Sequence, residues 1–444
     1  MNSHSKFAEF MKYSAFNIMG MLGLSCYILA DTYFVSKGLG TKGLTALNLA
    51  IPVYSFIHGS GLMLGMGGAT RYSVFRERKA GQGVDGIFMN TVYLSVAISM
   101  LFLLTGVFFS DGLTVLLGAD AEVEVMTKTY LKVILLFAPA FMMNDVLVCF
   151  VRNDKNPRLS MISMLVGSLC NIVLDYVFIF PLGMGILGAV LATGAAPVIS
   201  MLLLSLHWKK KKNGIHFKWQ KPELSDMFSG IPLGFPSLVA EVSSGIVMIV
   251  YNIILLKIAQ NTGVAAYGVV ANLSLVVMAV YTGLAQGMQP VISSDFGRRD
   301  AKSIRKVVRY GMTVMLILSA VIYLTMCGFA SEIAGIFNSG NDAGLQSMAV
   351  QGIRLYFTAV PFAGFNIVIA AVFTSTQKVI PAHLISLLRG FILIIPLAVL
   401  LSRLWGIYGI WLTFPVTEGI AAVLGIVIYM KKKSGELLCA KEDK

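Results

Sequence analysis

The sequence predicts an all-α, multi-span membrane protein whose twelve transmembrane helices form two parallel-repeat six-helix bundles. Of the 444 residues, 57% are hydrophobic and only 13% are charged, whereas an average soluble domain carries about a quarter charged residues. The apolar residues gather into twelve stretches of the length that a membrane helix needs, roughly 20 residues. Short motifs in the first half recur in the second half at a nearly constant offset.

The twelve predicted spans are bounded by charged or turn residues, so each can be placed to within a few residues. They are Tyr13–Val35, Leu47–Val74, Phe88–Phe109, Tyr130–Val151, Leu159–Phe180, Leu187–Trp208, Met227–Leu256, Val264–Ile292, Val307–Phe329, Tyr356–Phe373, Ile380–Leu401 and Ile407–Met430. The first span lacks a cleavage site of small residues, so we expect no cleaved signal peptide.

The basic residues orient these spans. With both termini in the cytoplasm, 27 of the 35 Lys and Arg residues lie on the cytoplasmic side. Cytoplasmic loops of membrane proteins carry such an excess of Lys and Arg. The net charge of +13 is therefore explained by orientation and does not predict nucleic-acid binding. We expect a multi-pass protein of the plasma (inner) membrane with cytoplasmic N- and C-termini.

An internal duplication divides the chain near its middle. Three motifs recur in order, about 222 residues apart: Gly61-Leu62-x-x-Gly65-Met66 as Gly283-Leu284-x-x-Gly287-Met288, Pro139 with Asn144 as Pro361 with Asn366, and Gly185-Ile186-x-Gly188 as Gly406-Ile407-x-Gly409. Because each copy holds an even number of spans, the repeats are parallel. We predict an N-lobe over residues 1–208, a cytoplasmic linker over 209–226, a C-lobe over 227–430 and a cytoplasmic tail over 431–444.

Ionisable residues inside the spans are the candidate functional residues. A charge at the centre of a bilayer costs roughly 2.5–3.5 kcal/mol on insertion scales. Within the predicted spans lie the acids Asp31, Asp145, Asp175, Glu241 and Glu418 and the base Arg389.

Asn171 and Asp175 are four residues apart in one span, so they share a helical face. A carboxylate beside an amide oxygen suits Na⁺, and a desolvated carboxylate near a second one suits a proton. Either ion fits the pair, and structural hydrogen bonding between helices is the alternative.

Asp31 follows the apolar run Tyr27–Ala30 near the outer end of its span, where an interfacial acid at a helix end is the alternative to a functional residue. The other three acids, Asp145, Glu241 and Glu418, have different interpretations. Glu241 follows Pro232 and Pro236 in the first span of the second half, which favours a role with substrate or protons, and a snorkelling or lipid-facing position is the alternative. We expect Asp145 to pair with basic groups near the interface, such as those around Arg152, and to be structural. Glu418 and Arg389 lie in the last two spans and are expected to pair with each other.

The sequence gives no sign of an enzyme or of ATP-driven transport. It has no Walker A motif, and its five cysteines and five histidines show no metal-ligand spacing. We therefore expect no cofactor, and a secondary carrier whose energy comes from an ion gradient.

The sequence resembles the multidrug and toxic compound extrusion (MATE) transporters over essentially its whole length. The resemblance rests on Ala30-Asp31-Thr32-Tyr33-Phe34-Val35 with Gly38-Leu39-Gly40, on Asn171-Ile-Val-Leu-Asp175, on Gly185-Ile-Leu-Gly188-Ala189 with Ala192-Thr193, and on Gly287-Met-Gln289-Pro290. It is similar to the bacterial branch that carries an Asp in the first span.

The resemblance implies two six-helix lobes and antiport of a substrate against inward H⁺ or Na⁺. It places a cation-coupling site, with Na⁺ as one possible ion, at Asp31, Asn171, Asp175 and Thr193. It also makes Asn144 and Glu241 candidates for substrate binding or for coupling. The acid that one branch carries in the tenth span has no counterpart in Tyr356–Phe373.

The leading hypothesis is a monomeric antiporter that exports organic cations, drugs or other amphipathic toxins. The nearest alternative is a flippase for lipid-linked oligosaccharides from the same superfamily, which would favour a cationic cleft for pyrophosphate. A major-facilitator carrier is less well supported, because Asp295-Phe296-Gly297-Arg298-Arg299 resembles that family's loop signature but lies between spans eight and nine.

Overall fold

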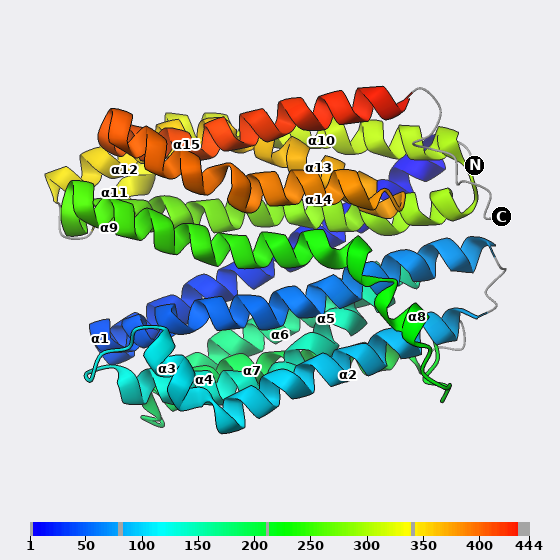
Figure 1. The fold of residues 1–444 in the computed structure, drawn as a ribbon, viewed down its shortest axis with the longest axis horizontal. Helices are drawn as coiled ribbons and strands as arrows, with labels where there is room; N and C mark the ends of the chain where they lie inside the picture. Colours follow the sequence, from blue (N-terminus) through cyan, green and yellow to red (C-terminus); the bar gives the residue numbers. More distant parts are fainter. Residues whose placement is uncertain (1–2, 79–82, 210–212, 339–341, 434–444) are drawn as a thin grey trace. The chain divides into compact units, whose positions relative to one another are not determined.

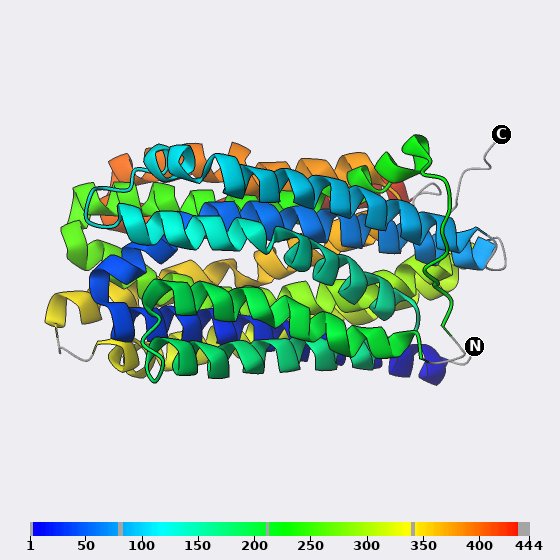
Figure 2. The ribbon, with the colours of Figure 1, turned by 90° about the horizontal axis from the view of Figure 1, so that it is seen from below.

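The computed structural model describes residues 3–78, 83–209, 213–338 and 342–433, and the described residues form helices and short connections (Figure 1). Contacts divide the chain into a first unit, Met19–Val242, and a second unit, Met1–Ile18 with Ser243–Lys444. Within each unit the long helices run lengthwise beside one another (Figures 1 and 2). These units group residues 1–18 and 227–242 differently from the expected lobes, whose bounds remain a prediction. Linker residues 210–212 and tail residues 434–444 lie outside the described residues.

The helices follow the predicted spans in order. Those up to the linker are α1 (Ser3–Arg78), α2 (Val84–Phe108), α3 (Ser110–Leu116), α4 (Glu124–Leu136), α5 (Ala138–Asn153), α6 (Pro157–Ile179), α7 (Gly185–Leu204) and the 3₁₀ turn η1 (Ser205–His207). The linker carries α8 (Leu224–Phe228). The rest are α9 (Ile231–Gly297), α10 (Ala301–Gly328), α11 (Ala330–Phe337), α12 (Ala343–Tyr356), η2 (Phe357–Ala359), α13 (Val360–Ser375), α14 (Val379–Leu387), the π-helical turn η3 (Leu388–Ile392) and α15 (Ile394–Lys433).

Three of the long helical stretches contain two spans each: α1, α9, and the continuous run of α14, η3 and α15. Among the described residues, eight helices are long and apolar enough to cross a membrane, and the bent pair α4–α5 makes nine. The helices α1, α9 and α15 are each interrupted by one non-helical residue, Gly40, Gln260 and Gly406. Each interruption lies between two predicted spans, so nine candidates with three of them double give the twelve predicted spans. The predicted fold class is confirmed.

The repeated prolines mark breaks within the fourth and tenth spans. Pro139 lies in the first turn of α5, directly after a bend of 47° from α4. Pro361 lies in the first turn of α13, directly after the 3₁₀ turn η2. A proline cannot donate a backbone hydrogen bond and fits the first turn of a helix. The sequence comparison found the repeated pair, and the structure shows that both copies restart a helix.

The repeated glycines are positions where helices approach closely. A Cβ added to Gly61 would lie 2.5 Å from the Asp145 carboxylate and 3.0 Å from the Met142 Cα. In the second unit, a Cβ on Gly287 would lie 2.5 Å from the Ser14 Cα. Small residues permit such contacts between membrane helices.

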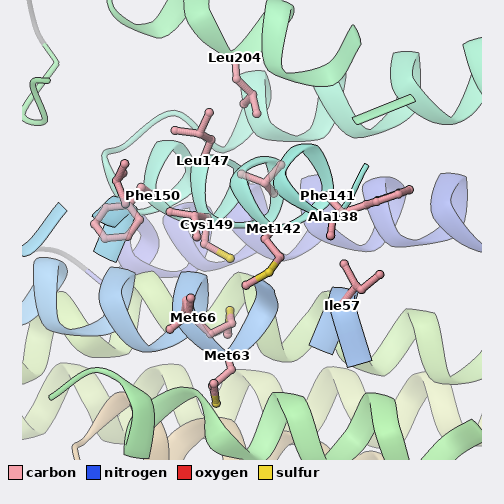
Figure 3. Close-up of a cluster of buried hydrophobic side chains, with 14 of the residues drawn as sticks. Ile57, Met63, Met66, Ala138, Phe141, Met142, Leu147, Cys149, Phe150 and Leu204 are labelled. Carbon is pink, nitrogen blue, oxygen red and sulfur yellow. The ribbon is translucent and has the colours of Figure 1, made fainter. Parts of the chain in front are cut away.

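Gly40 divides α1 into a first arm, residues 3–39, and a second arm, residues 41–78. The second arm packs against α5 around an apolar cluster. Ile57 and Met66 of α1 face Phe141 and Met142 of α5 (Figure 3). These side chains are buried. The close packing fixes the position of any polar residue that lies between them on the two helices.

One end of the first unit brings together the ends of the second, fourth and sixth predicted spans. Asp154, directly after α5, accepts hydrogen bonds from the Tyr72 hydroxyl at 2.5 Å, His207 Nε2 at 2.8 Å and the Gly214 backbone N–H at 2.7 Å. Burial alone would raise the pKa of Asp154, but the bonds from His207, Tyr72 and Gly214 hold the pKa below its ordinary value. The ends of these three spans therefore lie together at one end of this unit.

The second unit brings the N-terminus to the loop after the eighth span. Lys6 lies 2.7 Å from the Asp295 carboxylate near the end of α9, and both side chains are buried. Phe7 packs edge to face on Tyr310 of α10, with ring centroids 5.1 Å apart. The start of α1 therefore lies at the same end of the unit as the basic start of α10.

Candidate functional site

The carboxyls of Asp31 and Asp175 meet inside the first unit. Asp31 lies on the first arm of α1 and Asp175 on α6, and they are 7% and 0% exposed. Two glycines let this arm pack closely on α6. A Cβ added to Gly23 would lie 2.5 Å from the Leu165 side chain, and one added to Gly38 would lie 2.4 Å from the Ile179 side chain. The two carboxyls lie within hydrogen-bonding reach of each other.

One oxygen of each carboxyl lacks a donor. Asp31 Oδ1 and Asp175 Oδ1 are buried, and no hydrogen-bond donor of the described residues reaches them. An ionised carboxylate only accepts hydrogen bonds, so a bond between two carboxyls requires a proton on one of them. Burying two unpaired negative charges side by side is highly unfavourable. The pair therefore requires a proton or another cation.

Asn171 and Thr193 complete this cluster, as the sequence predicts. In the amide orientation that satisfies both groups, Asn171 Nδ2 donates to Asp175 Oδ2 at 3.1 Å, and its Oδ1 accepts from the Thr193 backbone N–H at 3.2 Å. The Thr193 hydroxyl donates to the Ala189 carbonyl at 3.1 Å. The four residues Asp31, Asn171, Asp175 and Thr193 thus lie together. Their roles in ion coupling remain a prediction.

Two tyrosines that the sequence analysis did not single out border the cluster. The Tyr130 hydroxyl of α4 is within hydrogen-bonding reach of the Thr193 side chain. Tyr27, one helical turn before Asp31, interacts electrostatically with both Asp31 and Asp175. Its spacing of four residues from Asp31 was the available signal, because residues i and i+4 share a helical face. Tyr130 has no such signal among the 16 tyrosines of the chain.

Asp145 pairs with a histidine and not with the basic groups near Arg152. His58 Nδ1 lies 2.9 Å from Asp145 Oδ2. The Arg152 guanidinium contacts instead the sulfur atoms of Met66 and Cys149, at 3.0 and 3.5 Å. The expected pairing of Asp145 is therefore wrong, because the side chain points across to α1 and not along its own helix.

The two substrate or second-lobe candidates, Glu241 and Asn144, also belong to the first unit. Glu241 of α9 interacts electrostatically with both His58 and Asp145. Asn144 lies beside Asp145 on α5, and its buried Oδ1 has no hydrogen-bond partner among the described residues. The structure thus brings Glu241 to the His58–Asp145 pair. A substrate role for either candidate stays a prediction.

The predicted pairing of Arg389 and Glu418 is confirmed in the second unit. Arg389 donates from Nε at 3.0 Å and from Nη2 at 2.7 Å to Glu418 Oε1. Asn366 of α13 donates to Glu418 Oε2 at 2.7 Å and to the Glu418 backbone carbonyl at 2.9 Å. Both charges are neutralised within the bundle, which supports a structural role for the pair.

The described residues contain no group of three or more His, Cys, Asp or Glu side chains that could hold a metal ion. The oxygen cluster at Asp31 and Asp175 contains two carboxyls, an amide and a hydroxyl, which are oxygen donors suited to a hard monovalent cation. An ion bound there would be a coupling ion that the protein transports, and not a resident metal cofactor.

Comparison with known proteins identifies relatives over nearly the whole chain. The model of the MatE family matches residues 17–177 and 236–400, one segment in each half. The multidrug export protein MepA of Staphylococcus saprophyticus is 25% identical over 96% of this chain and 93% of its own length. MepA of Staphylococcus aureus strain MRSA252 is 24% identical over 95% of this chain and 93% of its own.

Solved structures share the fold. An outward-facing multidrug resistance MATE family transporter of the MOP superfamily superposes with a TM-score of 0.90 at 22% identity, over 96% of each chain. A MOP superfamily transporter from Pyrococcus furiosus superposes with a TM-score of 0.89 at 21% identity, over 96% of each chain. The family match covers more than half of the chain, in both repeats. The chain therefore belongs to the MatE family of multi-span membrane transporters, and it is a transporter of small molecules and not an enzyme.

Proposed function

We propose that this transporter is a drug exporter that exchanges organic cations, drugs or other amphipathic toxins for an inward-moving cation bound at Asp31 and Asp175. The observation that carries the proposal is the buried carboxyl pair, in which Oδ1 of each residue has no donor among the described residues. The MepA relatives, which carry the name of multidrug export proteins, support the class of substrate.

A proton is the coupling ion that the carboxyl pair favours. A direct hydrogen bond between two carboxyls requires a proton on one of them, and Asp31 and Asp175 lie within reach of such a bond. Asn171 and Thr193 fix the pair in place, and Asn171 already uses its amide to bind Asp175 and the Thr193 backbone. Na⁺ is the alternative ion, because it would use the same carboxyl, amide and hydroxyl oxygens.

The exchange follows from differential binding. A cation at the pair removes the repulsion between the two carboxylates and stabilises the conformation in which α1 and α6 are close. Release of that cation favours a conformation with the carboxyls apart. Transport is coupled when ion and substrate stabilise different conformations or compete for the same negative charge.

We further propose that both termini lie in the cytoplasm and that the protein acts as a monomer in the plasma membrane without nucleic-acid partners. The N-terminus lies at the same end of the second unit as the basic start of α10. In the first unit the ends of the second, fourth and sixth predicted spans meet around Asp154. Both groupings agree with the distribution of Lys and Arg between the two sides of the membrane.

Oligosaccharide flipping is less well supported. The transporter from Pyrococcus furiosus is described by a reversed pocket polarity that suggests a different function, so the shared fold does not by itself determine the substrate. In this chain, the first unit presents the buried carboxyls of Asp31, Asp145 and Asp175. A pyrophosphate linkage would be repelled by these groups when they are ionised.

Transport by purified protein in liposomes tests the proposal. Ethidium uptake is followed under an imposed pH gradient or an imposed Na⁺ gradient, with valinomycin and equal K⁺ holding the membrane potential at zero. We expect one gradient to drive accumulation, and Asp31→Asn and Asp175→Asn to lose at least about nine-tenths of it. Asp111→Asn removes an exposed acid outside the cluster and serves as the control. Full gradient-driven accumulation by both cluster variants would refute the proposal, as would wild-type protein that moves no organic cation.

A further inference from the structure

His58 occupies a position built for close contact with two other helices. It lies on the second arm of α1, next to Gly59 and three residues before Gly61. A Cβ on Gly59 would lie 3.1 Å from the Glu241 Cβ, and one on Gly61 would lie 2.5 Å from Asp145 Oδ2. The absence of side chains at these two positions lets the acids of α9 and α5 approach the imidazole.

Three side chains interact with the His58 imidazole. His58 Nδ1 lies 2.9 Å from Asp145 Oδ2, and the two side chains are 13% and 9% exposed. Glu241 of α9 interacts electrostatically with both of them. The ring of Tyr54, on the same arm of α1, stacks on His58 with ring centroids 5.7 Å apart and an interplanar angle of 7°.

Tyr54 also connects this group to the carboxyl pair. Its hydroxyl lies 3.0 Å from the hydroxyl of Tyr27. Tyr27 in turn interacts electrostatically with Asp31, Asp145 and Asp175. A cation at the His58 group therefore changes the electrostatic energy of the Asp31–Asp175 pair, and the reverse also holds, because charges interact strongly in a medium of low dielectric constant.

A buried histidine of the same unit, His207, shows what a fixed structural pair looks like. His207 Nε2 lies 2.8 Å from Asp154 Oδ2, but Asp154 also accepts bonds from Tyr72, Arg76 and the Gly214 backbone. That carboxylate therefore has three hydrogen-bond donors besides His207. At His58 the imidazole instead lies against the Asp145 carboxyl and interacts electrostatically with Glu241, so its proton changes how much negative charge these two acids present.

We propose that His58 is a second proton-exchange residue of this transporter, and that its protonated imidazole competes with the transported organic cation for the negative charge of Asp145 and Glu241. The proton that His58 releases when substrate binds adds to the proton exchanged at Asp31 and Asp175. The inference rests on the proposed export of organic cations and names a residue that takes part in it. His58 exchanges a proton itself, and it affects the substrate through the two acids without contacting it.

Proton linkage distinguishes this role from a purely structural one. Tetraphenylphosphonium is the probe, because its charge does not titrate. Its dissociation constant is measured for purified protein in nanodiscs between pH 6 and pH 9, and the slope of log Kd against pH gives the protons released per cation bound. We expect His58→Gln to reduce the largest slope by up to one proton, since glutamine retains a hydrogen bond but cannot be protonated.

Two further variants sharpen the test. His58→Lys carries a fixed charge, so it should bind the probe at least about tenfold more weakly at pH 8 than His58→Gln. His207→Gln is the matched control and should keep the wild-type slope in protein that elutes as a single folded species. A wild-type slope in His58→Gln overturns the inference. Wild-type protein that binds no organic cation at any pH refutes instead the proposed function.

Discussion

Removing Glu418 tests whether the charges of the second unit are structural. The change Glu418→Ala eliminates two hydrogen bonds from Arg389, at 3.0 and 2.7 Å, and one from Asn366 at 2.7 Å. The Arg389 guanidinium, whose side chain is 18% exposed, then lies in the bundle without this partner. Breaking a buried ion pair by removing one member costs about 3–5 kcal/mol. We expect a loss of unfolding free energy in that range.

Replacing both partners should restore much of this loss. In Arg389→Met with Glu418→Leu no charge is left unpaired, and removing both members of a buried pair is often close to neutral. Asn366 keeps its bond to the backbone carbonyl of residue 418. We expect the double variant to recover at least half of the stability that Glu418→Ala loses.

Equilibrium unfolding in mixed detergent and SDS micelles measures these differences. Glu332→Ala, at an exposed acid, is the control and should change the free energy by less than about 0.5 kcal/mol. The double variant should also retain gradient-driven ethidium transport. The assignment fails if Glu418→Ala is as stable as wild type, or if the double variant folds but has lost transport.

Three more predictions concern single positions. Gly61→Ala places a methyl group 2.5 Å from the Asp145 carboxylate, so it should weaken ethidium transport at least tenfold in folded protein. Gly112→Ala is the control, because its added methyl group meets nothing within 4 Å, and it should have wild-type transport in the same assay. Gln260 has φ 53° and ψ −150°, a conformation that costs a non-glycine residue about 1–3 kcal/mol, so Gln260→Gly should unfold at higher SDS than wild type, and an unchanged midpoint would contradict the strain. The pKa of Asp154 is lowered in the folded state, so its stabilisation is complete above its ordinary pKa of 3.8 and is lost as the pH falls below it. Asp154→Asn should therefore be less stable than wild type at pH 7, and the difference in stability should become smaller at acid pH. Thermal unfolding of both proteins at neutral and at acid pH measures this difference.

Apolar length and charge predicted the fold well, because the bilayer imposes both. All twelve spans and the pairing of Arg389 with Glu418 could be predicted from the sequence. A single base and an acid in adjacent spans are expected to pair, because an unpaired charge inside a membrane is unfavourable. Asn171 and Asp175 were joined by their spacing of four residues. The interruption at Gln260 could not be read in this way, because its positive φ falls on a residue type that rarely adopts it.

Contacts across helices were harder to predict. Asp31 joins Asp175 across 144 positions of sequence, and only the family resemblance placed them together. The pairing of His58 with Asp145 spans 87 positions. A single histidine in a glycine-rich span carries no periodic signal, and the glycines that admit Asp145 and Glu241 are identified only by the packing of α5 and α9.

Infrared difference spectroscopy of the carboxyl groups tests the central claim most directly. The claim is that Asp31 and Asp175 share a proton that leaves when substrate binds. Adding tetraphenylphosphonium to wild-type protein in nanodiscs should remove the carbonyl stretching band of a protonated carboxyl, and Asp175→Asn should lack that change. A band change of wild-type size in both Asp31→Asn and Asp175→Asn would contradict the account.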